Sequence, residues 1–435
     1  MKKFFSKNKK LILMILFTLA ALLIWRIAVY IKIPFFNVEM PEGDKEANLI
    51  GFLDIFTGGA LSQFSIVALG VSPYITASIV VQLLQMDIVP QFKEWAEEGE
   101  SGKAKLNQWT RYIALFLAFV QALTFIITYI RNYGTYILNV YEITPFDYVY
   151  MALTVTAGTA FVLWLSDQIS MKGIGNGASM MIVAGIIAGF PGMVNSLISG
   201  LLKPDTETGF VPGTKEYIIF AVVIVVLLLV VVGVVFMEGL QRKIPIQYAN
   251  RPAAAQVRGK QDSNIPIKLN SASVIPVIFS ATLLSLPMTV INLLNIQNEN
   301  LAFWLEVVFS YRKPIGFALY IILIFLFAFF YSFLQINPDK MSENLKKQNA
   351  YIPGVKPGED TAAYISKVLF KITVLGATYL ALLASLPIIL GNVFGLPESV
   401  QIGGTSIMIV VGVAIETAKQ IKTQTQSQEY RGFLR

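Results

Sequence analysis

The stretch YIIFAVVIVVLLLVVVGVVFM, at residues 217–237, is an apolar run without a single charged side chain. A helix of about 20 such residues can cross the hydrocarbon core of a bilayer. The whole chain of 435 residues is 55% hydrophobic and 14% charged, whereas soluble domains are about 45–50% apolar and about 25% charged. The strands of a membrane β-barrel alternate in hydrophobicity over about ten residues, and this run does not. The sequence therefore predicts an all-α polytopic membrane protein.

Other apolar runs of similar length are distributed along the chain and predict ten transmembrane helices. An even number of spans places both termini on the same side of the membrane. The predicted spans lie near residues 11–31, 65–86, 109–130, 146–167, 175–196, 217–237, 272–293, 314–335, 369–390 and 402–421.

The basic residues lie mainly on one side of these spans. With a cytoplasmic N-terminus, 26 Lys and Arg residues fall in cytoplasmic segments and 7 fall on the other side. Because Lys and Arg are enriched in cytoplasmic loops, both termini are predicted to be cytoplasmic. The same rule accounts for the net charge of +7 better than nucleic-acid binding does. The first span is predicted to be an uncleaved anchor, since Ile33-Pro34-Phe35-Phe36 follows it in place of a small-residue cleavage site.

The composition excludes several kinds of chemistry. The chain has no Cys and no His, which removes thiol nucleophiles, disulfides, Cys/His zinc sites and His-based acid–base mechanisms. We expect no catalytic residues, no metal ion and no cofactor, and hence no enzyme. A secondary transporter would need ionisable groups that pair or bind an ion in mid-membrane, but only Arg26 and Glu416 lie more than one turn inside a predicted span. An uncharged path instead suits a pore that is closed by dewetting.

A short segment before the second span has a helical pattern but cannot cross the membrane. Its apolar residues Leu49, Phe52, Leu53 and Phe56 recur at helical spacing, yet the segment at 48–61 is too short and too polar to span. It is either a helix resting on the membrane surface or a re-entrant helix inside a protein cavity. The pattern alone leaves both alternatives open.

The chain divides into two halves of five spans each, at residues 1–200 and 201–435. An odd number of spans per half would make two similar halves inverted repeats, and the number of spans is the sole basis for this prediction. Two long basic loops, 239–271 and 336–368, lie on the predicted cytoplasmic side. They serve either as topology signals that also attract anionic lipid or as a docking face for an acidic or nucleic-acid partner. Their length favours docking.

Several short motifs of a resemblance that covers the chain from the first span to the tail occur in one order and at suitable separations. They are Gly58 to Leu61, Pro73 to Ile79, Glu98 to Lys103, Gly173 to Gly177, Val274 to Phe279, Asn337-Pro338, Tyr351 to Gly358 and Gly403 to Ser406. With these motifs the sequence closely resembles the SecY family, the channel subunit of the bacterial protein translocase.

The resemblance implies a ten-helix clamshell of two inverted five-helix halves with a short re-entrant plug helix. Such a channel passes unfolded secretory proteins across the plasma membrane of a bacterium and releases transmembrane segments sideways into lipid. The implied partners are small membrane subunits similar to SecE and SecG, the SecA motor ATPase, the ribosome, the secretory preprotein with its signal peptide, and membrane lipid. The long basic loops resemble the docking sites for the ribosome and SecA.

The resemblance also assigns roles to individual residues. The plug covers about residues 48–63 and includes Leu49, Phe52, Leu53, Phe56, Gly58 and Gly59. The hydrophobic pore ring carries over to Val71, Ile75, Ala178, Ile182, Ile278 and Ile409. Polar positions of the lateral gate carry over to Thr76, Gln82 and Asn270. The residues that dock cytoplasmic partners are Arg242, Lys243, Arg251, Arg258, Lys346, Lys347 and Lys356.

The leading hypothesis for the function is a passive protein-conducting channel driven by a cytoplasmic ATPase or by translation. The alternatives are an accessory copy of this channel for restricted substrates, a small-solute secondary transporter and a membrane insertase without a pore. A solute bound in a closed midplane site would favour the transporter. Crosslinks from a stalled polypeptide to Ile278 would favour the channel.

Overall fold

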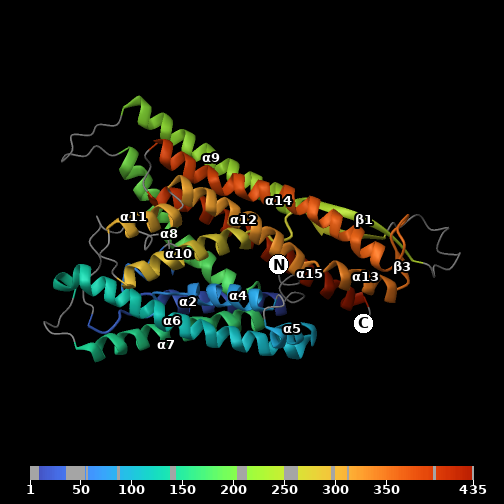
Figure 1. The fold of residues 1–435 in the computed structure, drawn as a ribbon, viewed down its shortest axis with the longest axis horizontal. Helices are drawn as coiled ribbons and strands as arrows, with labels where there is room; N and C mark the ends of the chain where they lie inside the picture. Colours follow the sequence, from blue (N-terminus) through green and yellow to red (C-terminus); the bar gives the residue numbers. More distant parts are fainter. Residues whose placement is uncertain are drawn as a thin grey trace.

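The computed structural model describes residues 9–35, 54, 57–85, 89–137, 144–202, 213–248, 263–294, 299–310, 313–394 and 398–433. Helices dominate this part of the chain, and the long helices run along the longest axis of the molecule (Figure 1). This arrangement is the one expected for a bundle that crosses a membrane.

Each predicted span overlaps one helix of the structure. Seven helical stretches of the described chain are long and apolar enough to cross a membrane, and α4 and the first part of α10 are apolar but shorter. The order and positions of the helices are consistent with ten spans. These helices are α2 (Lys9–Ala28), α4 (Ser72–Leu84), α6 (Glu100–Ile137), α7 (Pro145–Lys172), α8 (Gly177–Leu201), α9 (Thr214–Gly239), α10 (Ile275–Leu294), α12 (Pro314–Gln335), α14 (Glu359–Phe394) and α15 (Glu398–Phe433).

The second predicted span, 65–86, is helical only from residue 72 onward. Residues 58–71 form successive turns instead. Gly70 has a φ of 52°, which glycine adopts without steric cost, and α4 carries a proline in its first turn, where the missing N–H has no helical partner to lose. The apolar run therefore combines a folded loop with a helix of 13 residues.

The basic loops contain a small antiparallel sheet that the all-α prediction did not include. Its strands β1 (Gln241–Tyr248), β2 (Ser263–Lys268) and β3 (Ala350–Tyr351) lie in the order β2-β1-β3. Buried Ile244 and Ile246 alternate with exposed residues along β1, which is the period-two pattern of a half-buried strand. The remaining helices are α5 (Pro90–Glu97), α11 (Glu299–Phe309) and α13 (Pro338–Lys347).

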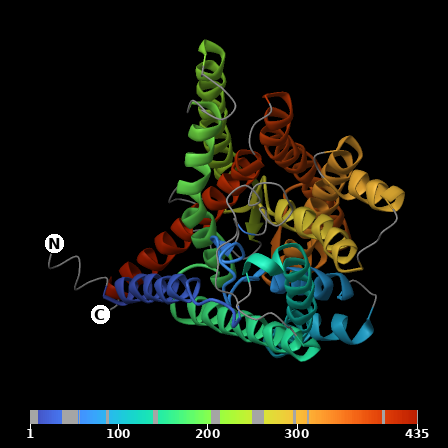
Figure 2. The same ribbon diagram turned by 90° about the vertical axis from the view of Figure 1, so that its left-hand side faces the viewer.

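Helices from the N-terminal and C-terminal parts of the chain meet in one buried apolar cluster. Helices α2, α6 and α7 lie together in the lower part of Figure 2, and α9, α12 and α14 lie in the upper part. The cluster between them, which we call the central cluster, contains residues of α2, α7, α8, α9, α10, α12, α14 and α15. The division of the chain at residue 200 and the inverted relation of the halves stay predictions. Fully buried members of the central cluster include Val29, Ala60, Val67, Ile169, Val230, Ile324, Ala384 and Met408.

The outer faces of several helices are apolar and exposed. Only 17% of the most apolar stretch of α9 is buried inside the protein. Leu228 and Leu229 of this helix are each 60% exposed. A helix that is apolar on all sides but packed on only one is suited to contact with lipid on the others. The exposure pattern therefore agrees with a membrane location for the bundle.

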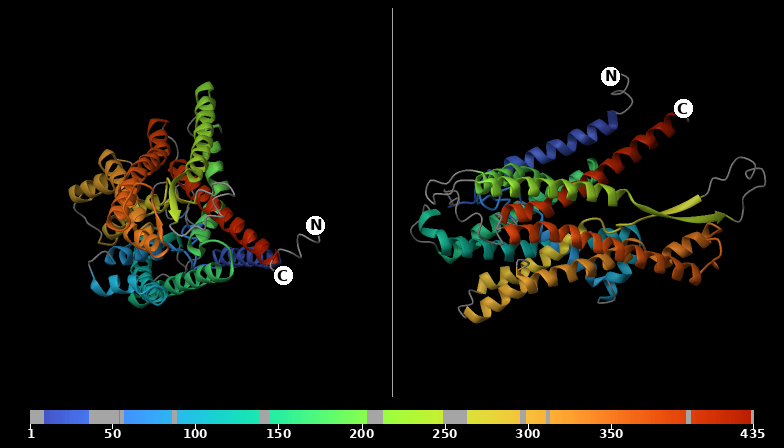
Figure 3. Two further views of the ribbon diagram at one scale, coloured as in Figure 1. Left: turned by 90° about the vertical axis from the view of Figure 1, so that its right-hand side faces the viewer. Right: turned by 90° about the horizontal axis from the view of Figure 1, so that it is seen from above.

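The start of α2, the end of α15, the sheet and α13 all lie toward the same end of the bundle (Figure 1 and Figure 3). The sheet and α13 belong to the two basic loops. This common location agrees with an even number of spans and with one basic, cytoplasmic end.

Candidate functional site

Five of the six predicted pore-ring residues come together in the central cluster. Val71, Ile182 and Ile409 are buried members, and Ile75 and Ile278 pack against the cluster from α4 and α10. These side chains come from the turn before α4 and from α4, α8, α10 and α15, so distant parts of the chain converge here. An apolar constriction of this kind can block ions without a charged gate.

Ala178 is half-buried in the first turn of α8 and is not a member of the central cluster. Helix α8 begins at this point because the Asn176 side chain caps it, accepting hydrogen bonds from the N–H of Ala178 at 3.0 Å and of Ser179 at 3.4 Å. Met181, which the sequence analysis did not select, is 2% exposed and belongs to the cluster. Its flexible side chain is suited to filling irregular space beside the smaller alanine.

The predicted plug is only partly described. Leu49, Phe52, Leu53 and Phe56 lie outside the described residues. Gly58 has a φ of 67°, and the N–H of Gly59 donates to the carbonyl of Asp54 at 3.0 Å. This is the Schellman pattern with which helices end at a glycine. A helix end at Gly58 agrees with the predicted short helix.

Gly58 is held closely between α2 and α8. The Arg26 guanidinium donates from Nη1 to the carbonyl of Gly58 at 2.7 Å. A Cβ added to Gly58 would lie 3.0 Å from the Cα of Gly185 and 3.1 Å from the ring of Trp25, closer than ordinary van der Waals contact. The sequence showed that Arg26 is a charge inside the first span, but it did not show the carbonyl to which this charge donates.

The turns after Gly58 are fixed to the end of α2 by backbone hydrogen bonds. The N–H of Ile33 donates to the carbonyl of Phe64 at 2.7 Å, and the N–H of Ile66 donates to the carbonyl of Ile31 at 2.9 Å. The Ser65 hydroxyl also donates to the carbonyl of Ala28 at 3.1 Å. Hydrogen bonds therefore hold this segment in place, close to the pore-ring residues that follow it in the chain.

Helices α4, α10 and α12 meet through apolar side chains. Ile79, Phe279 and Phe327 are buried in one shared cluster. The rings of Phe279 and Phe327 lie edge to face, with their centroids 5.8 Å apart. The helices predicted to form the lateral gate are thus in apolar contact in this structure, and their role as a gate stays a prediction.

The predicted polar gate residues form their hydrogen bonds elsewhere. The Thr76 hydroxyl donates to the carbonyl of Ser72 at 3.3 Å, and the Gln82 amide donates to the hydroxyl of Ser78 at 3.2 Å, both within α4. Asn270 lies near the end of α9 and donates to Glu238, as described next. The role of these three residues in the gate stays a prediction.

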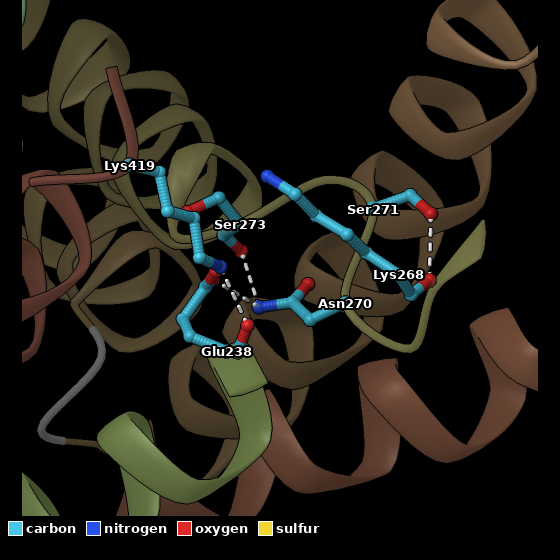
Figure 4. Close-up of polar contacts among 6 residues, drawn as sticks. All are labelled: Glu238, Lys268, Asn270, Ser271, Ser273 and Lys419. Carbon is cyan, nitrogen blue, oxygen red and sulfur yellow. Dashed lines mark hydrogen bonds and ion pairs between the residues drawn. The ribbon is translucent and has the colours of Figure 1, made fainter. Parts of the chain in front are cut away.

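Figure 4 shows a group of polar side chains where α9 ends and α10 begins, which we call the corner cluster: Glu238, Asn270, Ser273 and Lys419. The Glu238 carboxylate, in a residue that is 5% exposed, accepts from the Ser273 hydroxyl at 3.1 Å and from the Asn270 amide at 3.4 Å. Lys419 of α15 donates to the Glu238 carbonyl at 2.7 Å, and its Nζ lies 3.9 Å from the carboxylate Oε2. The sequence analysis selected only Asn270 of this cluster, as a gate residue, and the signal for Glu238 was an acidic residue directly after the 217–237 run.

The two basic loops form one small folded unit. Strand β1 of the first loop pairs with β3 of the second, with Gln247 opposite Tyr351, whose hydroxyl donates to the Gln247 side chain at 3.0 Å. Ile246, Leu345 and Ile365 are buried in an apolar cluster shared by both loops and α14. The exposed docking candidates on this unit are Arg242, Lys243, Lys346, Lys347 and Lys356, whereas Arg251 and Arg258 lie outside the described residues.

A cleft of about 1040 Å³ opens near this unit, between α5 and α6 on one side and α12, α13 and α14 on the other. Three lysines and several phenylalanines line it together, so that one end of the contact between α4 and α12 is both basic and apolar. The described residues contain no group of three or more His, Cys, Asp or Glu that could hold a metal ion. The lysines and phenylalanines of the cleft are Lys93, Lys103, Lys340, Phe329, Phe330, Phe333 and Phe370.

Comparisons with known proteins agree with this geometry. A family model described as SecY matches residues 65–418. A protein translocase subunit SecY from Halalkalibacterium halodurans is 44% identical over 421 residues, which are 97% of this chain and 96% of that protein. A solved structure described as "The structure of a protein conducting channel" has a TM-score of 0.64 at 19% identity, over 96% of this chain and 93% of that chain.

A second solved structure has the same fold. It is described as "Sec61 in the Canine ribosome-channel complex from the endoplasmic reticulum", and it has a TM-score of 0.61 at 19% identity, with 96% of this chain and 93% of that chain covered. The match to the family model extends from the turns before α4 into α15, and the bacterial relative is similar over nearly the whole length. The chain therefore belongs to the SecY family.

Proposed function

We propose that this chain is the channel through which a bacterial translocase moves unfolded secretory proteins across the plasma membrane and releases transmembrane segments into lipid. The observation that carries the proposal is the convergence of Val71, Ile182 and Ile409 from both halves in one apolar cluster. Apolar side chains can seal around a moving polypeptide without binding it, because they offer no hydrogen bonds to its backbone. The chain itself acts passively, and a cytoplasmic ATPase or translation supplies the energy.

The segment at about residues 48–63 acts as the plug of this channel. The surface-helix alternative is disfavoured because Thr57, Ala60 and Leu61, in the described part of the segment, are at most 3% exposed. Ala60 belongs to the same central cluster as the pore ring. A movement of the segment would therefore change the packing of the constriction directly.

Sideways release uses the contact between α4 and α10, which α6 and α12 flank. Because Ile79 and Phe279 make this contact with apolar side chains, its separation leaves no unpaired polar group, and lipid tails can replace the lost packing. The Oε1 atom of Gln82 is buried without a hydrogen-bond partner in the described structure. It is an acceptor that a polar group of a passing signal peptide could satisfy.

The exposed basic residues on the unit formed by the two loops are the docking surface for cytoplasmic partners. Positive surfaces of this kind accelerate association with acidic proteins and with ribosomal RNA. The solved ribosome-channel complex with the same fold supports the ribosome as one partner, and the SecA motor ATPase is the other. Small membrane subunits similar to SecE and SecG complete the assembly, since a two-sided clamshell needs a brace.

The proposed function is tested by the single-channel conductance of the purified protein in planar bilayers. We expect the wild-type protein to be sealed and a deletion of residues 49–60 to produce large, flickering conductance. An exposed substitution, Glu98→Gln, removes one partner of a surface ion pair with Lys105 and should leave the membrane sealed. If neither protein conducts ions and a solute is taken up stoichiometrically, the protein is a transporter and not a channel.

The directionality and the substrate are tested in proteoliposomes. Vesicles that contain the protein with SecE-like and SecG-like subunits should import an unfolded secretory protein when SecA and ATP are added. Insertion of membrane proteins without import of secretory proteins would instead indicate an insertase. Import of only a few of many precursors would indicate an accessory channel.

A further inference from the structure

The corner cluster places a buried carboxylate where helices usually disfavour one. Glu238 is in the last turn of α9, near the negative end of the helix dipole, which repels an acidic side chain. Burial adds a second cost, because a charge that leaves water must be compensated by partners. The stability of α9 therefore does not explain the presence of this carboxylate, whereas its partners, which all lie outside α9, suggest a role in joining helices.

The backbone between β2 and α10 is confined on several sides. The N–H of Leu269 donates to the carbonyl of Leu240 at 3.0 Å. Glycines of two neighbouring helices allow the close approach, since a Cβ at Gly376 of α14 would lie 2.9 Å from the carbonyl of Leu269 and a Cβ at Gly412 of α15 would lie 3.2 Å from Val274. This corner therefore lies against α9, α14 and α15 simultaneously.

Ser273 is the strained residue of the corner. Its φ is 53°, a left-handed conformation that is unfavourable for a residue with a Cβ. The Glu238 carboxylate accepts from its hydroxyl at 3.1 Å, and the Asn270 amide donates to its carbonyl at 3.1 Å (Figure 4). These bonds compensate for the unfavourable backbone conformation directly before α10.

The direction of α10 depends on this corner. Helix α10 starts two residues after Ser273, and its first turn carries Ile278, which packs against the central cluster. The next residue, Phe279, packs with Ile79 of α4. A change in the backbone at Ser273 would thus alter both the constriction and the contact between α4 and α10.

We propose that the corner cluster is a charged anchor that keeps the strained start of α10 directed toward α4, so that Glu238 and Lys419 bias the lateral gate toward its closed state. Opening then takes place as a rotation of α10 about this corner. Glu238, Ser273 and Lys419 are positioning residues, because they act through α10 without contacting the translocated chain. The proposal rests on the proposed channel function and adds a control element to it.

The gate can be measured directly because the chain has no native cysteine. In a protein that carries Ile79→Cys and Phe279→Cys, the rate of disulfide formation under mild oxidation reports how long α4 and α10 remain in contact. We expect Glu238→Gln, which removes the 3.9 Å ion pair with Lys419, to slow this crosslinking by about tenfold. Lys419→Met removes that ion pair and also the 2.7 Å bond to the Glu238 main-chain carbonyl, so it should slow crosslinking at least as much. The double variant should be no slower than the slower single variant, because coupled residues are not additive.

Two substitutions at Ser273 separate backbone strain from the hydroxyl. Ser273→Ala loses the hydrogen bond and keeps the cost of a positive φ, so it should slow crosslinking. Ser273→Gly also loses the bond but adopts the same φ freely, so it should slow crosslinking less. Equal rates in these two variants would contradict the proposed role of the strained backbone.

Control experiments distinguish loss of the anchor from loss of the channel function and from unfolding of the protein. Glu98→Gln removes a carboxylate from an exposed ion pair with Lys105 at 2.9 Å and should leave the crosslinking rate unchanged. Thermal unfolding of each variant identifies those that are merely unfolded. If deletion of residues 49–60 opens a conducting pore while Glu238→Gln and Lys419→Met crosslink like the parent, the anchor is wrong and the channel stands. If the deletion variant also does not conduct ions, the proposed channel function itself is wrong.

Discussion

Replacement of Gly58 by alanine should unseat the plug by a predictable amount. The left-handed φ of 67° costs an alanine roughly 1–2 kcal/mol. The added Cβ would lie 3.0 Å from the Cα of Gly185 and 3.1 Å from the Trp25 ring, and overpacking of this kind costs about 1–3 kcal/mol. The backbone of α8 cannot move aside as a flexible side chain can. The seated state should therefore lose about 2–5 kcal/mol in total relative to an unseated state.

Gly59→Ala is the matched control for this experiment. Gly59 has a similar φ of 84°, but the nearest atom to its added Cβ is the Gln63 side-chain nitrogen at 3.7 Å, an ordinary contact. With Gly59→Ala the seated state should therefore lose only the roughly 1–2 kcal/mol that the left-handed backbone costs. The difference of about 1–3 kcal/mol between the two variants corresponds to about 5–150-fold in the equilibrium between seated and unseated plug.

The assay is the open probability in planar bilayers, with the deletion of residues 49–60 as the upper limit. Gly58→Ala should approach that limit, and Gly59→Ala should lie between it and the wild type. Equal open probabilities for the two alanine variants would show that the contact with α8 does not hold the plug. Wild-type behaviour of both, beside an open deletion variant, would refute the assignment of Gly58 as the fixed end of the segment.

Three further sets of substitutions test the Arg26 hydrogen bond, the pore ring and the docking surface. Arg26→Gln removes a charge-assisted bond of 2.7 Å to the Gly58 carbonyl, worth about 1.5–3 kcal/mol, so resting conductance should rise, and Arg26→Lys should restore part of the seal; equal conductance in both variants would reject the bond. Ala178→Ile adds bulk to the smallest side chain of the predicted ring, so the resting ion leak should fall, and an unchanged leak would reject a pore-facing Ala178. Charge reversal with Lys346→Glu and Lys347→Glu should weaken ribosome or SecA binding to vesicles and lower its sensitivity to salt, with unchanged circular dichroism as the control for folding; unchanged affinity would exclude these lysines from the docking surface.

The sequence by itself determined the membrane class, the positions of the apolar runs and the distribution of charge between the two sides. These properties are additive along the chain. An apolar run such as 217–237 is long enough to span whatever it packs against, and a lysine in a loop carries its charge independently of the fold. The resemblance to the SecY family added the residues of the ring, and five of the six come together in the central cluster.

Tertiary structure alone decided which distant groups meet. Arg26 donates to a carbonyl that is 32 positions away, Lys419 donates to a carbonyl that is 181 positions away, and β1 pairs with a strand from the other basic loop. Asn270 donates to Glu238 and not across to α4. Within a membrane the backbone polar groups must find partners in the protein, and which partner is within reach depends on helix packing, which no local pattern encodes.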